Sequence, residues 1–128
     1  MFHSTGQIAY FANPPHYKSI VVVDSELARY YRQQVPVEVK LNRPKYSAHI
    51  SVVRNEIPVN LNAWAAYEGQ AIEFEYEHQI YNDELYYWLN CYSPRLEEIR
   101  QELGLTSTRS PNGAHRFHCT LGNLKVPK

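Results

Sequence analysis

Between positions 72 and 80 the sequence alternates strictly between two kinds of side chain. Apolar or aromatic residues and one histidine alternate with acidic residues and one glutamine: Ile72, Phe74, Tyr76, His78 and Ile80 against Glu73, Glu75, Glu77 and Gln79. Because successive side chains of a strand point to opposite faces, this run predicts a strand with one buried face and one acidic, solvated face. The interpretation places His78 in the core. It also excludes a long nucleic acid from the acidic face.

The residues that follow predict a hairpin, a helix and a last strand. Asn82 and Asp83 form the hairpin turn, and residues 85–92 return as the partner strand. Ser93 and Pro94 are typical of a helix N-cap and first helical position, and Gly104 of a helix end. Apolar residues recur at helical spacing between them: Leu96, Ile99 and Leu103. A polar loop over 106–115 then leads into a strand over 117–121.

The first half of the chain predicts a similar order of elements. Residues 7–12 and 19–24 indicate two strands, and the β-branched run 20–23 is typical of a strand buried on both faces. A helix capped by Asp24 or Ser25 is expected through about position 34, with Leu27, Tyr30 and Tyr31 as its apolar stripe. Residues 35–39 are expected to be extended, 42–44 to turn, 46–53 to form a strand, and 60–69 to contain one helical turn.

Together these elements predict one α+β domain spanning residues 1–128. Each half has strands, then a helix, then a further strand, and no linker or low-complexity segment divides them. We therefore expect two pseudo-symmetric lobes of antiparallel sheet, approximately 1–60 and 61–128, which are not independent domains. Helices are expected to pack outside the sheet, with a groove between the lobes.

The last strand of each half carries a histidine two residues before a hydroxyl residue. The two segments are His49-Ile50-Ser51-Val52 and His118-Cys119-Thr120-Leu121. On a strand the histidine and the hydroxyl share one face, about 6.5 Å apart, and the apolar residues share the other. The bare pattern is weak, since His3-Ser4-Thr5 also fits it, but only the other two lie in strand-like surroundings.

These two motifs resemble the twin His-x-Ser/Thr signature of the 2H phosphoesterase superfamily, which includes LigT-like RNA 2′,3′-cyclic phosphodiesterases. The compact chain is also similar to viral members that degrade the cyclic oligonucleotide signals of bacterial CBASS defence. The resemblance implies a two-lobed fold and a metal-independent phosphodiesterase without a cofactor. It implies catalytic roles for His49, Ser51, His118 and Thr120: one imidazole as general base, the other as general acid, and the hydroxyls as donors to phosphate oxygens.

Four further residues near the motifs are candidates for substrate binding: Tyr17, Lys18, Arg54 and Arg116. A solvated surface charge is the usual alternative for such basic residues. The resemblance implies cleavage of 3′–5′ or cyclic nucleotide phosphodiesters, with cyclic oligonucleotide messengers of antiviral defence as the expected substrates. Processing of RNA ends with 2′,3′-cyclic phosphates, and a module that sequesters a nucleotide without cleaving it, remain the alternatives.

The overall charge and the cysteines limit the partners. The formal net charge is zero, which favours a small anionic nucleotide over long nucleic acid or a membrane surface. The start of the chain lacks the features of a secretory signal, and no apolar run is long enough for a membrane span. Cys91 and Cys119 lie in apolar, strand-like surroundings and are expected to be reduced, buried thiols. These features predict a cytoplasmic protein, in the host cytoplasm if it is viral.

Overall fold

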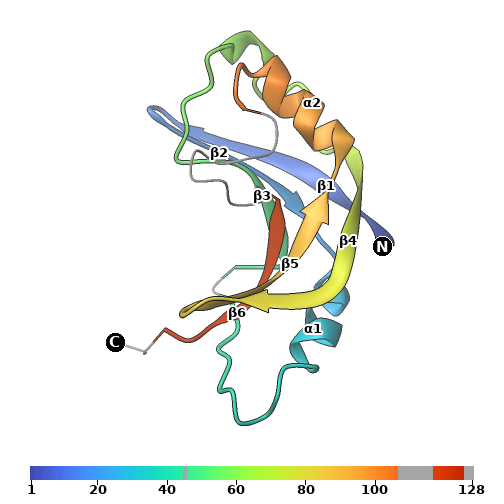
Figure 1. Ribbon diagram of the computed structural model, residues 1–128. Coiled ribbons are helices and arrows are strands. Elements are labelled where there is room, and N and C mark those ends of the chain that lie inside the picture. Colours follow the sequence, from blue (N-terminus) through green and yellow to red (C-terminus); the bar gives the residue numbers. More distant parts are fainter. Residues whose placement is uncertain (45, 107–116, 126–128) are drawn as a thin grey trace.

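The computed structural model describes residues 1–44, 46–106 and 117–125. The first half contains β1 (Phe2–Asn13), β2 (His16–Val22), α1 (Ser25–Arg32) and β3 (His49–Arg54). The second half contains a short 3₁₀ turn η1 (Leu61–Ala63), then β4 (Ala71–Asn82), β5 (Tyr86–Tyr92), α2 (Pro94–Glu102) and β6 (His118–Asn123). The chain is therefore an α+β fold, as the sequence predicts, with each histidine motif on the last strand of its half (Figure 1).

The six strands form one antiparallel sheet that closes on itself in the order β1-β2-β3-β6-β5-β4. The two halves meet along two seams. β1 pairs with β4 over six residue pairs, from Phe2 opposite Tyr76 to Gln7 opposite Ala71. The seam between β3 and β6 has one registered pair, Ile50 opposite Cys119. The two motif strands are thus neighbours in the sheet, although the sequence between them contains β4, β5 and α2.

The core lies between one face of this sheet and the two helices. Strand residues such as Ile50, Leu89 and Leu121 are fully buried, and the helices contribute Ala28 from α1 and Leu96 from α2. Because these residues fill one face of β3 and β6, the alternate residues of the same strands are left for the opposite face.

Local sequence explains where both helices begin. The Asp24 side chain accepts a hydrogen bond of 2.9 Å from the Glu26 backbone amide at the start of α1. Ser93 Oγ accepts one of 3.3 Å from the Leu96 amide at the start of α2, and Pro94 follows it as expected. Gly104 ends α2 with a positive φ of 79°, a conformation that costs glycine little.

The prediction that His78 lies in the core is wrong, because its side chain is exposed. The pairing of β4 with β5 shifts register between Tyr76 and Ile80, and such an irregularity breaks the alternation of faces. Within the same irregular stretch, Glu77 is half-buried and accepts hydrogen bonds from the hydroxyls of Tyr81 and Tyr92. The acidic face is therefore only partly solvated.

Three predictions for the first half also need correction. β2 is buried on one face only, since Val21 is fully buried whereas Val22 is 42% exposed. On α1 the buried residues are Ala28 and Tyr31, whereas Tyr30 is exposed because successive residues of a helix point about 100° apart around its axis. Residues 35–39 form turns instead of an extended segment, with the Val39 amide bonded to the Pro36 carbonyl.

Other predictions are confirmed or lie outside the described residues. The hairpin turn begins at Asp83, whose carboxylate accepts hydrogen bonds from the Leu85 and Tyr86 amides. Most of the predicted polar loop lies outside the described residues, and so does the candidate binding residue Arg116 that follows it. None of the helices in the described part of the chain has the length and hydropathy required to span a bilayer.

Candidate active site

The registered pair between β3 and β6 fixes how the two motifs face each other. Ile50 and Cys119 are opposite one another and point into the core. In an antiparallel pair their neighbours are also opposite, so His49 lies across from Thr120 and Ser51 across from His118. Opposite residues have Cβ atoms about 4.5–5.5 Å apart, and diagonal pairs about 7–8 Å.

All four motif side chains are half-buried on the face that points away from the core. The four residues form a square, with His49 and Ser51 on β3 facing Thr120 and His118 on β6. The two histidines lie at one pair of opposite corners and the two hydroxyl residues at the other. Each imidazole therefore has a hydroxyl beside it on its own strand and another directly across the seam. A group placed over the centre of the square can contact two imidazoles and two hydroxyls at once.

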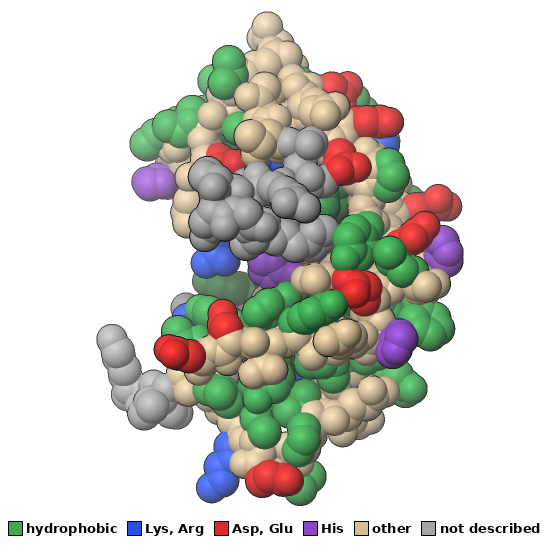
Figure 2. Space-filling model, viewed as in Figure 1, with side chains coloured by type: hydrophobic (Ala, Val, Ile, Leu, Met, Phe, Trp, Pro, Cys, Tyr) green, Lys and Arg blue, Asp and Glu red, His purple; other side chains and the backbone are tan. Residues whose placement is uncertain are grey.

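A pocket of about 580 Å³ opens over this face of the sheet. His49, Ser51 and Thr120 line it, together with three of the predicted binding residues: Tyr17, Lys18 and Arg54. His118 is not among the lining residues; its ring lies against Trp88, with centroids 6.2 Å apart. Figure 2 shows the molecule hollowed on the viewed face, with histidine and Lys or Arg side chains at the hollow.

The hydrogen bonding of His49 determines which ring nitrogen is available. Nδ1 lies 2.7 Å from the backbone carbonyl oxygen of Ser47. A carbonyl only accepts hydrogen bonds, so Nδ1 carries the proton and the neutral ring has its lone pair on Nε2. A carbonyl that fixes the tautomer in this way prepares Nε2 to accept a proton.

Among the described residues, the pocket lining contains no Asp or Glu but several basic side chains. The sequence predicted Lys18 and Arg54 there and missed Lys125 and His16. Lys125 lies beyond the end of β6, with its Nζ 5.1 Å from the Tyr86 ring centroid, and no periodicity in the sequence indicates that position. The pocket is thus locally cationic in a chain with zero formal net charge, which favours an anionic ligand.

Comparisons with protein-family models, curated proteins and solved structures found no match to this chain. What the site can do therefore follows from its own residues. Among the described residues, no three His, Cys, Asp or Glu side chains gather where they could hold a metal ion. The groups that the described part of the pocket offers are imidazoles, hydroxyls and cations.

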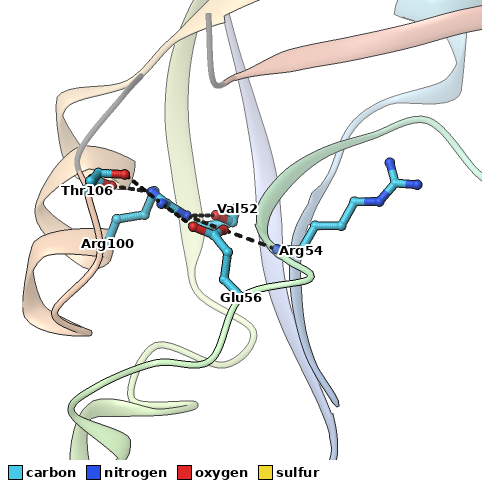
Figure 3. A network of polar contacts seen from close by, with 5 residues as sticks. All are labelled: Val52, Arg54, Glu56, Arg100 and Thr106. Carbon is cyan, nitrogen blue, oxygen red and sulfur yellow. Dashed lines mark hydrogen bonds and ion pairs between the residues drawn. The ribbon is translucent and has the colours of Figure 1, made fainter. Parts of the chain in front are cut away.

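A buried arginine supports β3 from behind the site (Figure 3). Arg100 on α2 is 0% exposed and forms a bidentate pair with Glu56, with N–O distances of 2.9 and 2.8 Å. The same guanidinium donates to the backbone carbonyls of Val52, at 2.7 Å, and Thr106, at 2.6 Å. Arg100 thus joins α2, the motif strand β3 and the segment after β3. Arg100 lies four residues after Leu96, on the apolar stripe of the helix, and this spacing in the sequence indicates that its side chain is buried.

Cys119 lies on the core side of the motif strand β6 and Cys91 lies on the neighbouring strand β5, and both are buried, reduced thiols. Burial raises the pKa of Cys119 to about 12 and raises that of Cys91 as well. Both thiols therefore remain protonated near neutral pH and are poor nucleophiles. The prediction of reduced, buried cysteines is confirmed, and the candidate chemistry is left to the imidazoles and hydroxyls on the other face.

Proposed function

We propose that this chain is a phosphodiesterase of the 2H type, with His49 and His118 as its general base and general acid. The observation that carries the proposal is the register of β3 against β6, which sets two imidazoles on one diagonal and two hydroxyls on the other. Histidine suits both roles because its ordinary pKa lies near neutrality.

The proposed reaction is a displacement at phosphorus. One imidazole takes a proton from a water molecule or a neighbouring 2′-hydroxyl, whose oxygen forms the new bond to phosphorus. The bond to the leaving oxygen breaks, and the other imidazolium gives that oxygen a proton. Ser51 and Thr120 donate hydrogen bonds to the non-bridging oxygens, where negative charge grows in the transition state. The scheme uses no metal and no cofactor.

The same proposal includes two pseudo-symmetric lobes with the reaction in a groove between them. Its support is that β1-β2-α1-β3 and β4-β5-α2-β6 have the same order of elements, and that each lobe contributes its last strand to the site. The lobes correspond to the halves expected from the sequence, near 1–60 and 61–128.

For the substrate we propose a small nucleotide, with cyclic oligonucleotide messengers of antiviral defence as the preferred class. The pocket volume favours a compact ligand, and the lack of acidic side chains among the described lining residues favours an anion. The site would then act in the cytoplasm, where such messengers are made. The two alternatives are processing of RNA ends with 2′,3′-cyclic phosphates and sequestration of a nucleotide without cleavage. The test below distinguishes both from cleavage of cyclic oligonucleotides.

The test is incubation of the protein in EDTA with cyclic di- and trinucleotides, RNA ending in a 2′,3′-cyclic phosphate and linear 2′–5′ oligonucleotides, with products read by mass spectrometry. We expect cleavage of the cyclic oligonucleotides, and a loss of about 10²–10⁴-fold in kcat for both His49→Ala and His118→Ala. His78→Ala is the matched control, because His78 is an exposed histidine outside the pocket.

Wild-type rates in either motif variant would overturn the acid–base assignment. Cleavage confined to RNA ends would replace the substrate class but retain the mechanism. Tight binding of a nucleotide that is recovered unchanged would identify a sequestering module.

A further inference from the structure

Three side chains form a row across the strands beside the proposed catalytic square. Phe11 on β1 lies opposite Lys18 on β2, and Lys18 lies opposite Arg54 on β3. Directly opposite residues of antiparallel strands point to the same face. All three also line the pocket that contains His49, Ser51 and Thr120. The row is therefore part of the same cavity and continues it toward the end of β3.

The two cations of this row have no acidic partner among the described residues. Lys18 and Arg54 are exposed, and neither belongs to any of the ion pairs of the described chain. Glu56, the acidic residue nearest in sequence to Arg54, is engaged by Arg100. Figure 3 shows the guanidinium of Arg54 pointing away from that pair. Two unneutralised cations side by side repel each other, so an anion between them is stabilised.

Aromatic rings flank the cations. Lys18 Nζ lies 5.7 Å from the ring centroid of Phe11 and 4.9 Å from that of Tyr46. Both rings are unusually open to solvent for their size, Phe11 at 53% and Tyr46 at 60% exposed. Exposed rings beside cations are the combination that binds single nucleotides, since a base can stack on a ring while a cation holds its phosphate.

The row lies beside the catalytic square along the strands. Lys18 and Ile20, which lie opposite Arg54 and Ser51, are two positions apart on β2, so Arg54 is about 7 Å from Ser51 along the strand direction across the register shift between them. A phosphate between His49 and His118 therefore lies over the square, and the row lies beside it. A neighbouring phosphate of the same nucleotide chain lies one nucleotide away and is within reach.

We propose that Lys18 and Arg54 form a subsite for a second phosphate, with the attached nucleoside between Phe11 and Tyr46. This inference rests on the proposed phosphodiesterase function and narrows its substrates to nucleotides with at least two phosphates. A mononucleoside cyclic phosphate fills the catalytic square alone. A dinucleotide, cyclic or linear, fills both places.

The experiment compares two substrates that share one reacting group. One is a nucleoside 2′,3′-cyclic phosphate, and the other is a dinucleotide with the same cyclic end and one additional 3′–5′ phosphate. A 3′,3′-cyclic dinucleotide is the third arm and distinguishes a cyclic source of the second phosphate from an RNA end. Lys18→Gln/Arg54→Gln is compared with Arg29→Gln/Lys40→Gln, which removes two exposed cations outside the pocket.

We expect the pocket double variant to lower kcat/KM for the two-phosphate substrates by at least about tenfold, the usual effect of losing a hydrogen bond to a charged group. Its rate on the one-phosphate substrate should change less than about twofold, and the control variant should match wild type on all three. An equal loss on one- and two-phosphate substrates, or no loss, would overturn the subsite and leave the phosphodiesterase proposal standing.

If no substrate is cleaved, the proposed function fails, and a binding measurement then tests the subsite by itself. Calorimetry with a phosphorothioate-linked dinucleotide should then give a Kd at least about tenfold higher for Lys18→Gln/Arg54→Gln than for wild type. An unchanged Kd, or no binding to wild type, would overturn the inference.

Discussion

Arg100 on α2 donates a hydrogen bond of 2.7 Å to the backbone carbonyl of Val52, the residue after Ser51 on β3. Arg32 at the end of α1 makes the corresponding contact in the other half, at 3.3 Å to the carbonyl of Leu121, the residue after Thr120 on β6. The helix of each half thus holds the motif strand of the other half. The β3–β6 seam has one registered residue pair, so these contacts supply support that the ladder itself does not.

Replacing Arg100 with methionine should lower the free energy of unfolding by about 3 kcal/mol. Methionine retains most of the buried stem, but Glu56 loses its bidentate partner, and breaking a buried ion pair typically costs 3–5 kcal/mol. The lower end is expected because the Glu56 side chain is 22% exposed. Urea denaturation followed by tryptophan fluorescence measures the change.

The control for this variant is Arg29→Met on α1. Arg29 pairs with Glu26 at 3.6 Å, but both side chains are more than half exposed, and such pairs contribute less than about 1 kcal/mol. Equal midpoints for Arg100→Met and wild type would show that the buried network does not stabilise the fold.

Most of the fold was predictable because its signals are local. The caps at Asp24 and Ser93, the turn at Asp83 and the helix end at Gly104 each depend on a side chain or backbone conformation within a few residues. The failure at His78 depends on a partner strand instead. His78 is exposed because β4 changes register against β5, and a single strand carries no record of that shift.

The candidate site shows the same division. Placing His49 and Ser51 on one face needs only the period of a strand. That β3 and β6 are adjacent depends on the closure of the whole sheet, and no local pattern specifies it. Lys125 and Tyr46 enter the pocket from outside the strands, where periodicity gives no guide.

A methyl group at Gly122 should destabilise the fold by about 1–3 kcal/mol, the usual cost of overpacking. An added Cβ would lie 2.5 Å from the Asn42 carbonyl oxygen and 2.5 Å from Leu41 Cγ. Asn42 is bridged to Asn123 by two backbone hydrogen bonds of 2.9 and 3.0 Å, so the segment before β3 would be forced away from β6. Thermal denaturation of Gly122→Ala tests this, and a midpoint equal to wild type would contradict it.

The stability of the protein should fall as the pH rises above about 9. Burial raises the pKa of Cys119 to about 12 from an ordinary 9.0, so the folded thiol keeps a proton that the unfolded chain releases. The contribution of the buried, protonated thiol to the free energy of unfolding is intact below pH 9. It shrinks between pH 9 and 12, by at most about 1.4 kcal/mol per pH unit for each thiol. Urea denaturation at pH 8 and pH 10 measures the fall.

The matched variant is Cys119→Ala, which lacks the thiol and should show a shallower fall between the same two pH values. Burial also raises the pKa of Tyr10 to about 12, but from an ordinary 10.0, so its contribution starts at a higher pH. A fall as steep in Cys119→Ala as in wild type would assign the effect to other groups.

The hydroxyls of Ser51 and Thr120 should each contribute to the rate with little effect on substrate binding. Donors aimed at oxygens that gain charge act in the transition state, and removing one typically lowers kcat about 10²–10³-fold. Ser51→Ala and Thr120→Val should show this loss with KM near the wild-type value. Ser47→Ala is the matched control, since His49 bonds only the backbone carbonyl of Ser47, which alanine retains. A rise in KM with kcat unchanged would show that the hydroxyls bind the substrate and do not stabilise the transition state.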